Sequence, residues 1–374
     1  MSVGEIMMAQ RRMRIGVVGA NGGTDRWGAR AHLPAIAALE EAELVAVCTS
    51  REGTAKRAQE RSGARLAFWD YQQMVRSPDI DIITVAVRIA LHHPIVMAAL
   101  EAGKHVFCEW PLALNAAQAA ELYGRAQSKG VAHAVGTQAR FSPGIMYAKE
   151  LMDSAYVGRP LFFHMTHFLS SAVEPRPSHR WWSTRAEEGG GAILIASGHA
   201  LDVVRWYLGE VAEVHGQVQT LVKETRFADT GEVVPVDAID TVAFLARLTN
   251  GVTGTVHVSN ACKRGSGFRL DIYGTEGRLS VESPHMVQYS PAKVYGAQGG
   301  EALHELPMPS RFHQVPLLPA DSQALQVAQL LRQFIRALQT GTAFHPDFGD
   351  AVGLHRTLEA VVRSSTTGRW EAVV

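Results

Sequence analysis

The chain has 374 residues, of which 47% are hydrophobic and 19% charged, a composition typical of a globular protein long enough for two domains. Lysine plus arginine equals aspartate plus glutamate at 36 each, so the sequence has no basic field to attract nucleic acid. No apolar run approaches the roughly 20 residues of a membrane span, and residues 1–12 lack the pattern of a signal peptide and predict a disordered tail. The cysteines Cys48, Cys108 and Cys262 lack metal-ligand spacing, so we expect no metal site and a cytoplasmic protein.

The stretch 13–39 predicts a strand, a tight glycine-rich turn and a helix. Glycines and the unpaired N–H groups of a helix start favour a pyrophosphate, so this turn is a candidate dinucleotide loop; a plain strand–turn–helix remains the alternative. Counting from Gly19, Asn21 and Thr24 stand where a Gly-x-Gly-x-x-Gly fingerprint has its second and third glycines. The expected cofactor contacts in this stretch are Gly19, Asn21, Gly22, Gly23, Thr24 and Trp27.

The second apolar run, 44–48, predicts a buried strand whose end contacts the ribose in dinucleotide-binding folds. An NAD-preferring site has an acidic residue there, whereas this chain has Ser50 and Arg51. A hydroxyl followed by a guanidinium suits a 2′-phosphate, so these residues favour NADP, with NAD as the alternative; a solvated arginine at a helix start is the simpler interpretation.

Repeated strand–helix pairs continue to residue 138 and predict a doubly wound parallel sheet, the first domain, over 13–138. The edge formed by the carboxyl ends of its strands is where ligands bind, and it receives Val87, Glu109 and Trp110. His92 and His93 follow on a helix about 100° apart, so they cannot form an i, i+4 metal pair, and at most one, His92, faces the cofactor.

The pattern changes after residue 138, and residues 139–374 predict an α+β domain with a large, mainly antiparallel open sheet. Its period-two runs are 161–168, 211–222, 238–248, 252–259 and 268–274. The segment 289–319 has no periodicity and predicts a long surface excursion. Helices are expected over 143–152, 323–338 and 350–363.

A long loop, 170–185, is rich in arginine and tryptophan, and loops of this length are usually functional. A helix beginning at about Gly198 follows, and it places His199 and Asp202 on one face because they are three residues apart. An unperturbed histidine titrates near neutral pH, so His199 is the candidate acid–base, with Asp202 to orient it, unless His199 is a helix cap and Asp202 a salt-bridge acid. The candidate substrate contacts are His179, Trp181, Trp182, Arg185 and His199.

Taken together, these features resemble the glucose–fructose oxidoreductase / inositol dehydrogenase (Gfo/Idh/MocA) family. The shared pattern covers nearly the whole chain in the right order: 16–19, Asp70-Tyr71, 102–106, 109–113, 189–191, and His199 with Asp202. Within that family the chain looks closest to the branch that holds the fungal galactose-regulon repressor, on 27–32, 87–92, Glu109-Trp110, 142–143 and 148–151.

The chain departs from the family's enzymatic pattern at three places. Trp110 replaces the lysine that usually polarises the reacting oxygen, Ile195 replaces an aspartate, and Val87-Arg88-Ile89 replaces Thr-Pro-Asn. An indole donates one hydrogen bond and cannot titrate, so Trp110 is expected to pack under the nicotinamide. His199, Asp202 and Trp110 remain as the candidate catalytic set.

The resemblance implies an NAD(P)-dependent oxidoreductase acting on a sugar, cyclitol or related polyol. The alternative is a non-catalytic nucleotide sensor like the repressor. The alternating strands of the second domain also leave one sheet face without a predicted cover, so we expect a homodimer or homotetramer through that face.

Overall fold

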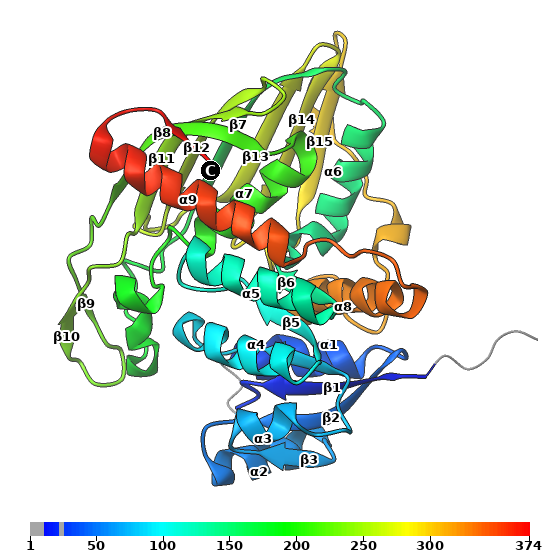
Figure 1. The fold of residues 1–374 in the computed structure, drawn as a ribbon. Helices are drawn as coiled ribbons and strands as arrows, with labels where there is room; N and C mark the ends of the chain where they lie inside the picture. Colours follow the sequence, from blue (N-terminus) through cyan, green and yellow to red (C-terminus); the bar gives the residue numbers. More distant parts are fainter. Residues whose placement is uncertain (1–10, 22–25) are drawn as a thin grey trace, which may run out of the picture.

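The computed structural model describes residues 11–21 and 26–374 (Figure 1), and its first part is a six-stranded sheet in the order β3-β2-β1-β4-β5-β6. All neighbouring strands are parallel, which confirms the predicted doubly wound fold. The strands are β1 Met13–Val18, β2 Ala42–Cys48, β3 Leu66–Phe68, β4 Ile82–Val85, β5 His105–Glu109 and β6 His133–Gly136. The central residues of these strands are buried on both faces, as continuous apolar runs require, except in the edge strand β3, which is half-buried.

Helical segments separate these strands. They are η1 Gly28–His32 (a π-helical turn), α1 Leu33–Ala37, α2 Glu52–Ser62, α3 Tyr71–Val75, η2 Ile89–Leu91, α4 His92–Glu101 and α5 Ala116–Lys129. Local capping defines their ends: Asp70 caps α3, Asn115 caps α5, and Gly63 ends α2 in the left-handed conformation.

The second part is a nine-stranded sheet in the order β16-β15-β14-β13-β7-β12-β11-β8-β17, with only the β7–β12 pair parallel. Its strands are β7 Pro160–Phe168, β8 Val211–Gln219, β11 Thr241–Leu248, β12 Thr253–Ser259, β13 Gly267–Gly274, β14 Gly277–Ser283, β15 Lys293–Gln298, β16 His304–Glu305 and β17 Glu371–Ala372. Alternating burial along β7, β11 and β12 confirms the period-two expectation.

The predicted excursion over 289–319 is wrong in part, because it contains β15 and β16, which extend the sheet. The sequence reading also missed β14, and the small hairpin of β9 Glu224–Arg226 and β10 Val233–Pro235. Strands β9, β10 and β16 have two or three residues and β15 is interrupted by Gly296, so their pattern is weak without a neighbour to pair with, whereas β14 is a regular seven-residue strand that the reading of the sequence overlooked.

Four longer helices follow residue 138 in the chain: α6 Pro143–Asp153, α7 Ile195–Leu208, α8 Gln323–Thr340 and α9 Phe348–Thr367. Helices α6, α7 and α9 lie on one face of the nine-stranded sheet (Figure 1). Helix α8 belongs in sequence to the second part but packs on η1 and α1, and it shares a core with Ile15 and Val17 of β1. None of the described helices is long and apolar enough to cross a membrane.

Four short helical turns complete the chain: η3 Gln138–Phe141, η4 Ser178–Thr184, η5 Ala186–Glu188 and η6 Ser310–Phe312. The long loop predicted over 170–185 therefore contains a 3-10 turn. The described part of the predicted N-terminal tail, Arg11 and Arg12, contacts Asp81 and the carbonyl oxygen of Ala42.

Candidate active site at the carboxyl edge of the parallel sheet

The turn after β1 is packed so closely against neighbouring backbone that it requires glycine. Gly19 has φ +102°, and a Cβ there would stand 2.2 Å from the carbonyl oxygen of Ala86, so only glycine fits. Gly28 packs equally closely, because its Cβ would lie 2.6 Å from the carbonyl oxygen of Gly19. Gly28 thus gives the close packing of helix on strand for which the fingerprint uses its third glycine.

Sequence reasoning assigned that third position to Thr24 and missed Gly28, because the loop is longer than the fingerprint allows. Gly22, Gly23 and Thr24 lie outside the described residues, and Asn21 is exposed.

The end of β2 is exposed to solvent and carries one arginine. Ser50 and Arg51 are both exposed, and Arg51 is the N-cap residue of α2. The Thr49 hydroxyl lies 2.6 Å from that of Thr54 and donates to the carbonyl oxygen of Arg51 at 3.1 Å, which fixes the turn. Within the described chain, the Arg51 guanidinium has no hydrogen-bond or ion-pair partner, so it is available to an anion.

A buried acid–imidazole pair closes the end of β5. Oε1 of Glu109 lies 2.7 Å from Nε2 of His32, and both side chains are buried. His32 comes from η1, so the pair joins the first helical turn to β5. Sequence reasoning expected Glu109 to contact the cofactor and did not single out His32, whose only signal was its place in the resemblance to the repressor branch.

His92 has a structural role in this edge. Its Nδ1 lies 2.8 Å from the carbonyl oxygen of Pro111 and its Nε2 lies 3.1 Å from that of Val87. Both ring nitrogens therefore contact the backbone after β5 and β4. Since both ring nitrogens of His92 contact the backbone, neither is available for the expected contact with the cofactor. Burial lowers the pKa of His92.

Trp110 is turned into the protein, contrary to the role expected for it. Its indole N–H donates to the carbonyl oxygen of Leu194 at 2.9 Å, and its ring lies 4.6 Å from that of His355. A Cβ on Gly198 would lie 2.3 Å from the indole Nε1, so the ring is pressed against α7. With 4% exposure and its only donor used, Trp110 cannot donate to a substrate hydroxyl.

His199 lies in the second turn of α7, which begins at Ile195, so the interpretation of His199 as a helix cap is wrong. Its side chain is 3% exposed and its Nδ1 has no hydrogen-bond partner within the described chain. Burial and, to a lesser degree, His167 lower the pKa of His199 to about 3. His199 is therefore a neutral imidazole at physiological pH.

Asp202 does not orient His199, which corrects the sequence-based expectation. Its carboxylate accepts two hydrogen bonds from Arg140, at 2.7 Å and 2.6 Å, and both side chains are buried. Asp350 lies 3.5 Å from the same guanidinium. The salt-bridge alternative for Asp202 is the one that the structure supports, and its partner comes from η3, 62 residues away.

The four loop residues predicted to contact substrate are held in a segment that adjoins η2. Trp181 is 44% exposed, Trp182 is half-buried, and Arg185 forms ion pairs with Glu187 and Asp237 at 3.8 Å and 3.6 Å. His179 is half-buried and also interacts with other groups. The segment's triple glycine packs closely, since a Cβ on Gly191 would lie 2.3 Å from the carbonyl oxygen of Ile239.

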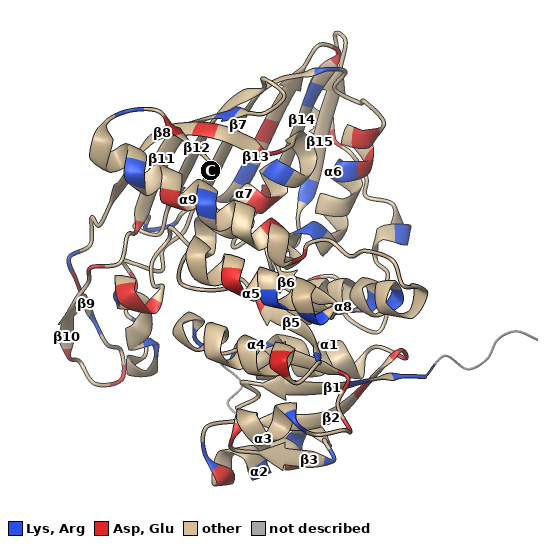
Figure 2. Cartoon of the chain, in the orientation of Figure 1, with Lys and Arg blue, Asp and Glu red and all other residues tan. Residues whose placement is uncertain are grey.

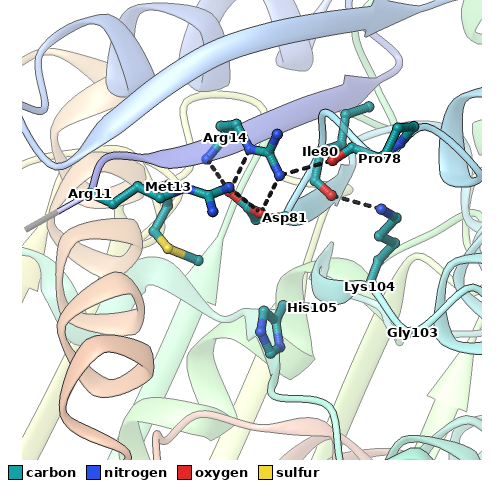
Figure 3. Close-up of a pocket in the computed structure, with 9 residues that line it drawn as sticks. All are labelled: Arg11, Met13, Arg14, Pro78, Ile80, Asp81, Gly103, Lys104 and His105. Atoms are coloured by element: carbon teal, nitrogen blue, oxygen red, sulfur yellow. Dashed lines mark hydrogen bonds and ion pairs between the residues drawn. The ribbon is translucent and has the colours of Figure 1, made fainter.

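A charged hollow of about 340 Å³ lies at the opposite, amino edge of the parallel sheet (Figure 3). Asp81 accepts hydrogen bonds from Arg11 and Arg14 there, and Lys104 donates to the carbonyl oxygens of Ser77 and Ile80. Protein oxygen atoms thus accept hydrogen bonds from Arg11, Arg14 and Lys104. The hollow lies between the start of β1 and the turns before β4 and β5.

Two further features bear on the expected partners. One possible metal-ligand atom of each of His345, Asp347 and Asp350 lies within 4.8 Å of the other two. These groups already bond one another, because Asp347 and Asp350 form the capping box of α9 and Nδ1 of His345 lies 2.7 Å from Oδ2 of Asp350. In the view of Figure 2, basic and acidic residues are interspersed over both parts of the chain.

Comparison with models of known protein families identifies the class to which this fold and this edge of the sheet belong. A model described as "Oxidoreductase family, NAD-binding Rossmann fold" matches residues 13–137, and the "GFO/IDH/MocA C-terminal domain" matches 145–280. The chain belongs to the Gfo/Idh/MocA family of oxidoreductases, as the sequence resemblance predicted.

Particular relatives cover most of the chain. The levoglucosan dehydrogenase of Pseudarthrobacter phenanthrenivorans is 26% identical over 84% of this chain and 86% of its own. The galactose/lactose metabolism regulatory protein GAL80 of Saccharomyces cerevisiae is 26% identical over 95% and 93%. The myo-inositol 2-dehydrogenase of Thermotoga maritima is 27% identical over 72% and 75%.

Solved structures share the fold. A levoglucosan dehydrogenase in complex with NADH and L-sorbose has a TM-score of 0.85 at 23% identity, covering 97% of this chain and 99% of that one. A super-repressor mutant of Gal80p from Saccharomyces cerevisiae also has a TM-score of 0.85 at 23% identity, covering 97% and 98%.

Proposed function

We propose that this chain is an NAD(P)-dependent oxidoreductase that transfers a hydride between nicotinamide and a sugar, cyclitol or related polyol or ketone. The observation that carries the proposal is that the family match extends over both parts of the chain. Relatives whose names state dehydrogenation of levoglucosan and myo-inositol are similar over at least 72% of it.

The residues at the carboxyl edge fit a nicotinamide dinucleotide. Gly19 allows the tight turn after β1, Gly28 brings η1 against it, and Ser50 with Arg51 lie exposed at the end of β2. The bound cofactor supplies the hydride donor or acceptor. The chain itself has to bind it, orient the substrate and move the hydroxyl proton.

His199 is the candidate for that proton transfer. Oxidation of an alcohol carbon releases a hydroxyl proton as the hydride leaves, so a neutral base has to be nearby. Burial lowers the pKa of His199 to about 3, so the imidazole is neutral before substrate binds, and bound substrate and cofactor would have to raise that pKa toward the working pH for His199 to act as the base. Neither Trp110 nor Asp202 is free to share this role, because each is bonded elsewhere.

A His199→Ala variant tests this assignment. We expect kcat with levoglucosan or myo-inositol to fall by about 10²–10⁴-fold, the usual loss when a general acid–base is removed. Binding of NAD⁺ and NADP⁺, measured by titration calorimetry, should stay near wild type, as should both properties in the exposed control His304→Ala. A variant with unchanged kcat would show that the proton goes to another group.

The second candidate function is a nucleotide-binding regulator without turnover. It is favoured by one observation: Trp110, at the place of the family lysine, uses its N–H inside the protein. GAL80, a regulatory protein by name, is similar over 95% of this chain. Tight dinucleotide binding with no turnover of any member of a polyol panel would select this function over the first.

We also propose NADP as the preferred cofactor, a cytoplasmic location and a homodimer or homotetramer. The unpartnered Arg51 supports the first, and the three cysteines, all unpaired, support the second. The proposed assembly rests on the outer face of the nine-stranded sheet, which carries exposed Phe162 and Leu245.

A further inference from the structure

Arg88 belongs to the nucleotide-binding part of the chain. It contacts residues in the stretch 181–188, which overlaps the end of the loop predicted to bind substrate. It stands at the place where the family pattern has Thr-Pro-Asn, between the end of β4 and η2. Its Nη1 lies 3.2 Å from Oε2 of Glu188, and its guanidinium carbon lies 5.4 Å from the ring centroid of Trp181. One side chain therefore contacts both Trp181, a candidate substrate contact, and Glu188, which follows the same loop.

The adjoining backbone contact is also close. Gly189 has φ +77°, and a Cβ there would lie 3.0 Å from Cδ1 of Ile89 and 3.1 Å from Cδ2 of Leu114. The end of the segment thus rests on apolar side chains of the nucleotide-binding part, directly beside the Arg88–Glu188 pair.

On its other side, the segment is bonded to the β9–β10 hairpin. Ser178 donates to Asp229 from its backbone N–H at 2.7 Å and from its hydroxyl at 2.6 Å, and Arg176 forms a β-bridge with Phe227. The backbone N–H of Ala186 donates to Asp237 at 2.7 Å. In Figure 1 the turns of residues 178–188 lie beside this hairpin. We call residues 170–191 with 220–237 the cap.

We propose that Arg88 is a positioning residue that docks the cap onto the cofactor edge and so sets the geometry in which substrate is held. This inference rests on the proposed function for the words "substrate" and "cofactor", but the docking itself is a property of the chain. The guanidinium is suited to the task because it can pair with a carboxylate and stack on an indole at the same time, which a lysine does less well.

Limited proteolysis measures the docking directly. Trypsin can cleave the cap after Arg180 and after Arg185, so the rate of cleavage there, followed by mass spectrometry on the NAD⁺-loaded protein, reports how often the cap opens. For Arg88→Ala we expect cleavage about threefold to tenfold faster than in wild type, from loss of one partly exposed ion pair and one cation–π contact. Arg88→Lys should lie between the two.

Controls separate docking from other effects. Arg356→Ala removes an exposed arginine of α9 that has no ion-pair or hydrogen-bond partner in the described chain, and it should be cleaved in the cap at the wild-type rate. Glu188→Gln and Trp181→Leu should each accelerate cleavage, and neither should add appreciably to Arg88→Ala in a double variant. The affinity for NAD⁺ by calorimetry should stay within about twofold of wild type in Arg88→Ala.

Three outcomes would overturn the proposal. The first is cleavage of the cap at the wild-type rate in Arg88→Ala, and the second is full additivity of the changes in cleavage rate in both double variants. The third is a tenfold loss of NAD⁺ affinity in Arg88→Ala, which would make Arg88 a cofactor residue. Where wild type turns over levoglucosan or myo-inositol, Arg88→Ala should raise KM with little change in kcat. Absence of turnover in wild type would refute the proposed function alone, because the cleavage rates still decide whether Arg88 docks the cap.

Discussion

The side chains of Trp110 and His355 are both buried and pack against each other. The indole is bonded to the carbonyl oxygen of Leu194, and the imidazole it packs on has no partner for either ring nitrogen within the described chain. Burial lowers the pKa of His355 to about 3. The place of a charged family lysine is thus occupied by a neutral aromatic pair, which favours packing over proton transfer there.

His355→Phe should make the protein less sensitive to acid. An unfolded histidine binds a proton below about pH 6.5 while the buried one stays neutral to about pH 3, so stability falls as pH drops through this range. Removing one such group should reduce the loss by about 1.4 kcal/mol per pH unit below pH 6. Urea unfolding at pH 7.5 and 5.0 checks this, with exposed His304→Phe as control. An identical pH slope in His355→Phe would contradict it.

Arg51→Ala should weaken NADP⁺ more than NAD⁺. A charge-assisted hydrogen bond contributes about 1.5–3 kcal/mol, so we expect at least about a tenfold loss of NADP⁺ affinity and little change for NAD⁺. The reason is that only NADP⁺ presents a 2′-phosphate to the end of β2. Calorimetric titration of both nucleotides is the measurement. Equal losses for the two would remove Arg51 from cofactor selection.

At the scale of elements, α7 is held by contacts from three directions. Its Gly198 lies against Trp110, its Asp202 pairs with Arg140 of η3, and its Arg205 donates to the carbonyl oxygen of Asp350 in α9 at 2.9 Å. These contacts fix the helix that carries His199 relative to both the nucleotide-binding part and the last helix. A rigid element of this kind gives more precise positioning than a loop.

Asp202→Asn should destabilise the fold rather than act on the chemistry alone. It leaves the 6%-exposed Arg140 without its bidentate partner, and breaking a buried pair typically costs about 3–5 kcal/mol. The double variant Arg140→Met/Asp202→Leu, which removes both charges, should lose less. Urea unfolding monitored by tryptophan fluorescence gives the comparison. A stable Asp202→Asn protein with lost activity would instead restore Asp202 as a partner of the chemistry.

At the scale of the whole molecule, the nine-stranded sheet is covered on one face by helices and carries exposed apolar side chains on the other. Phe162 and Leu245 are 47% and 44% exposed, and Phe162 stacks on Tyr273 with ring centroids 4.6 Å apart. These side chains come from β7, β11 and β13, near the middle of the sheet. A surface of this kind usually marks an interface, and a second copy of the chain is the occupant that we expect.

Light scattering at micromolar concentration should therefore give the mass of a dimer or tetramer. Phe162→Glu combined with Leu245→Lys should shift it toward the monomer, because both charges would be buried in the interface. Arg356→Ala on the helical side should leave the mass unchanged. A monomeric wild type would contradict the assembly.

The sequence by itself determined the two folding patterns and the edge that carries the site. Strands buried on both faces need continuous apolar runs, and half-exposed strands need apolar and polar residues in alternation. Because parallel strands all run in one direction, Gly19, Arg51 and Glu109, which lie at strand ends, meet at one edge of the sheet. Only the tertiary structure decided the partners: Arg140 for Asp202, His32 for Glu109, Leu194 for Trp110 and Gly28 against Gly19. The physical reason is that periodicity records which face of an element is buried, whereas a bond between residues 62 to 84 positions apart depends on how the elements pack.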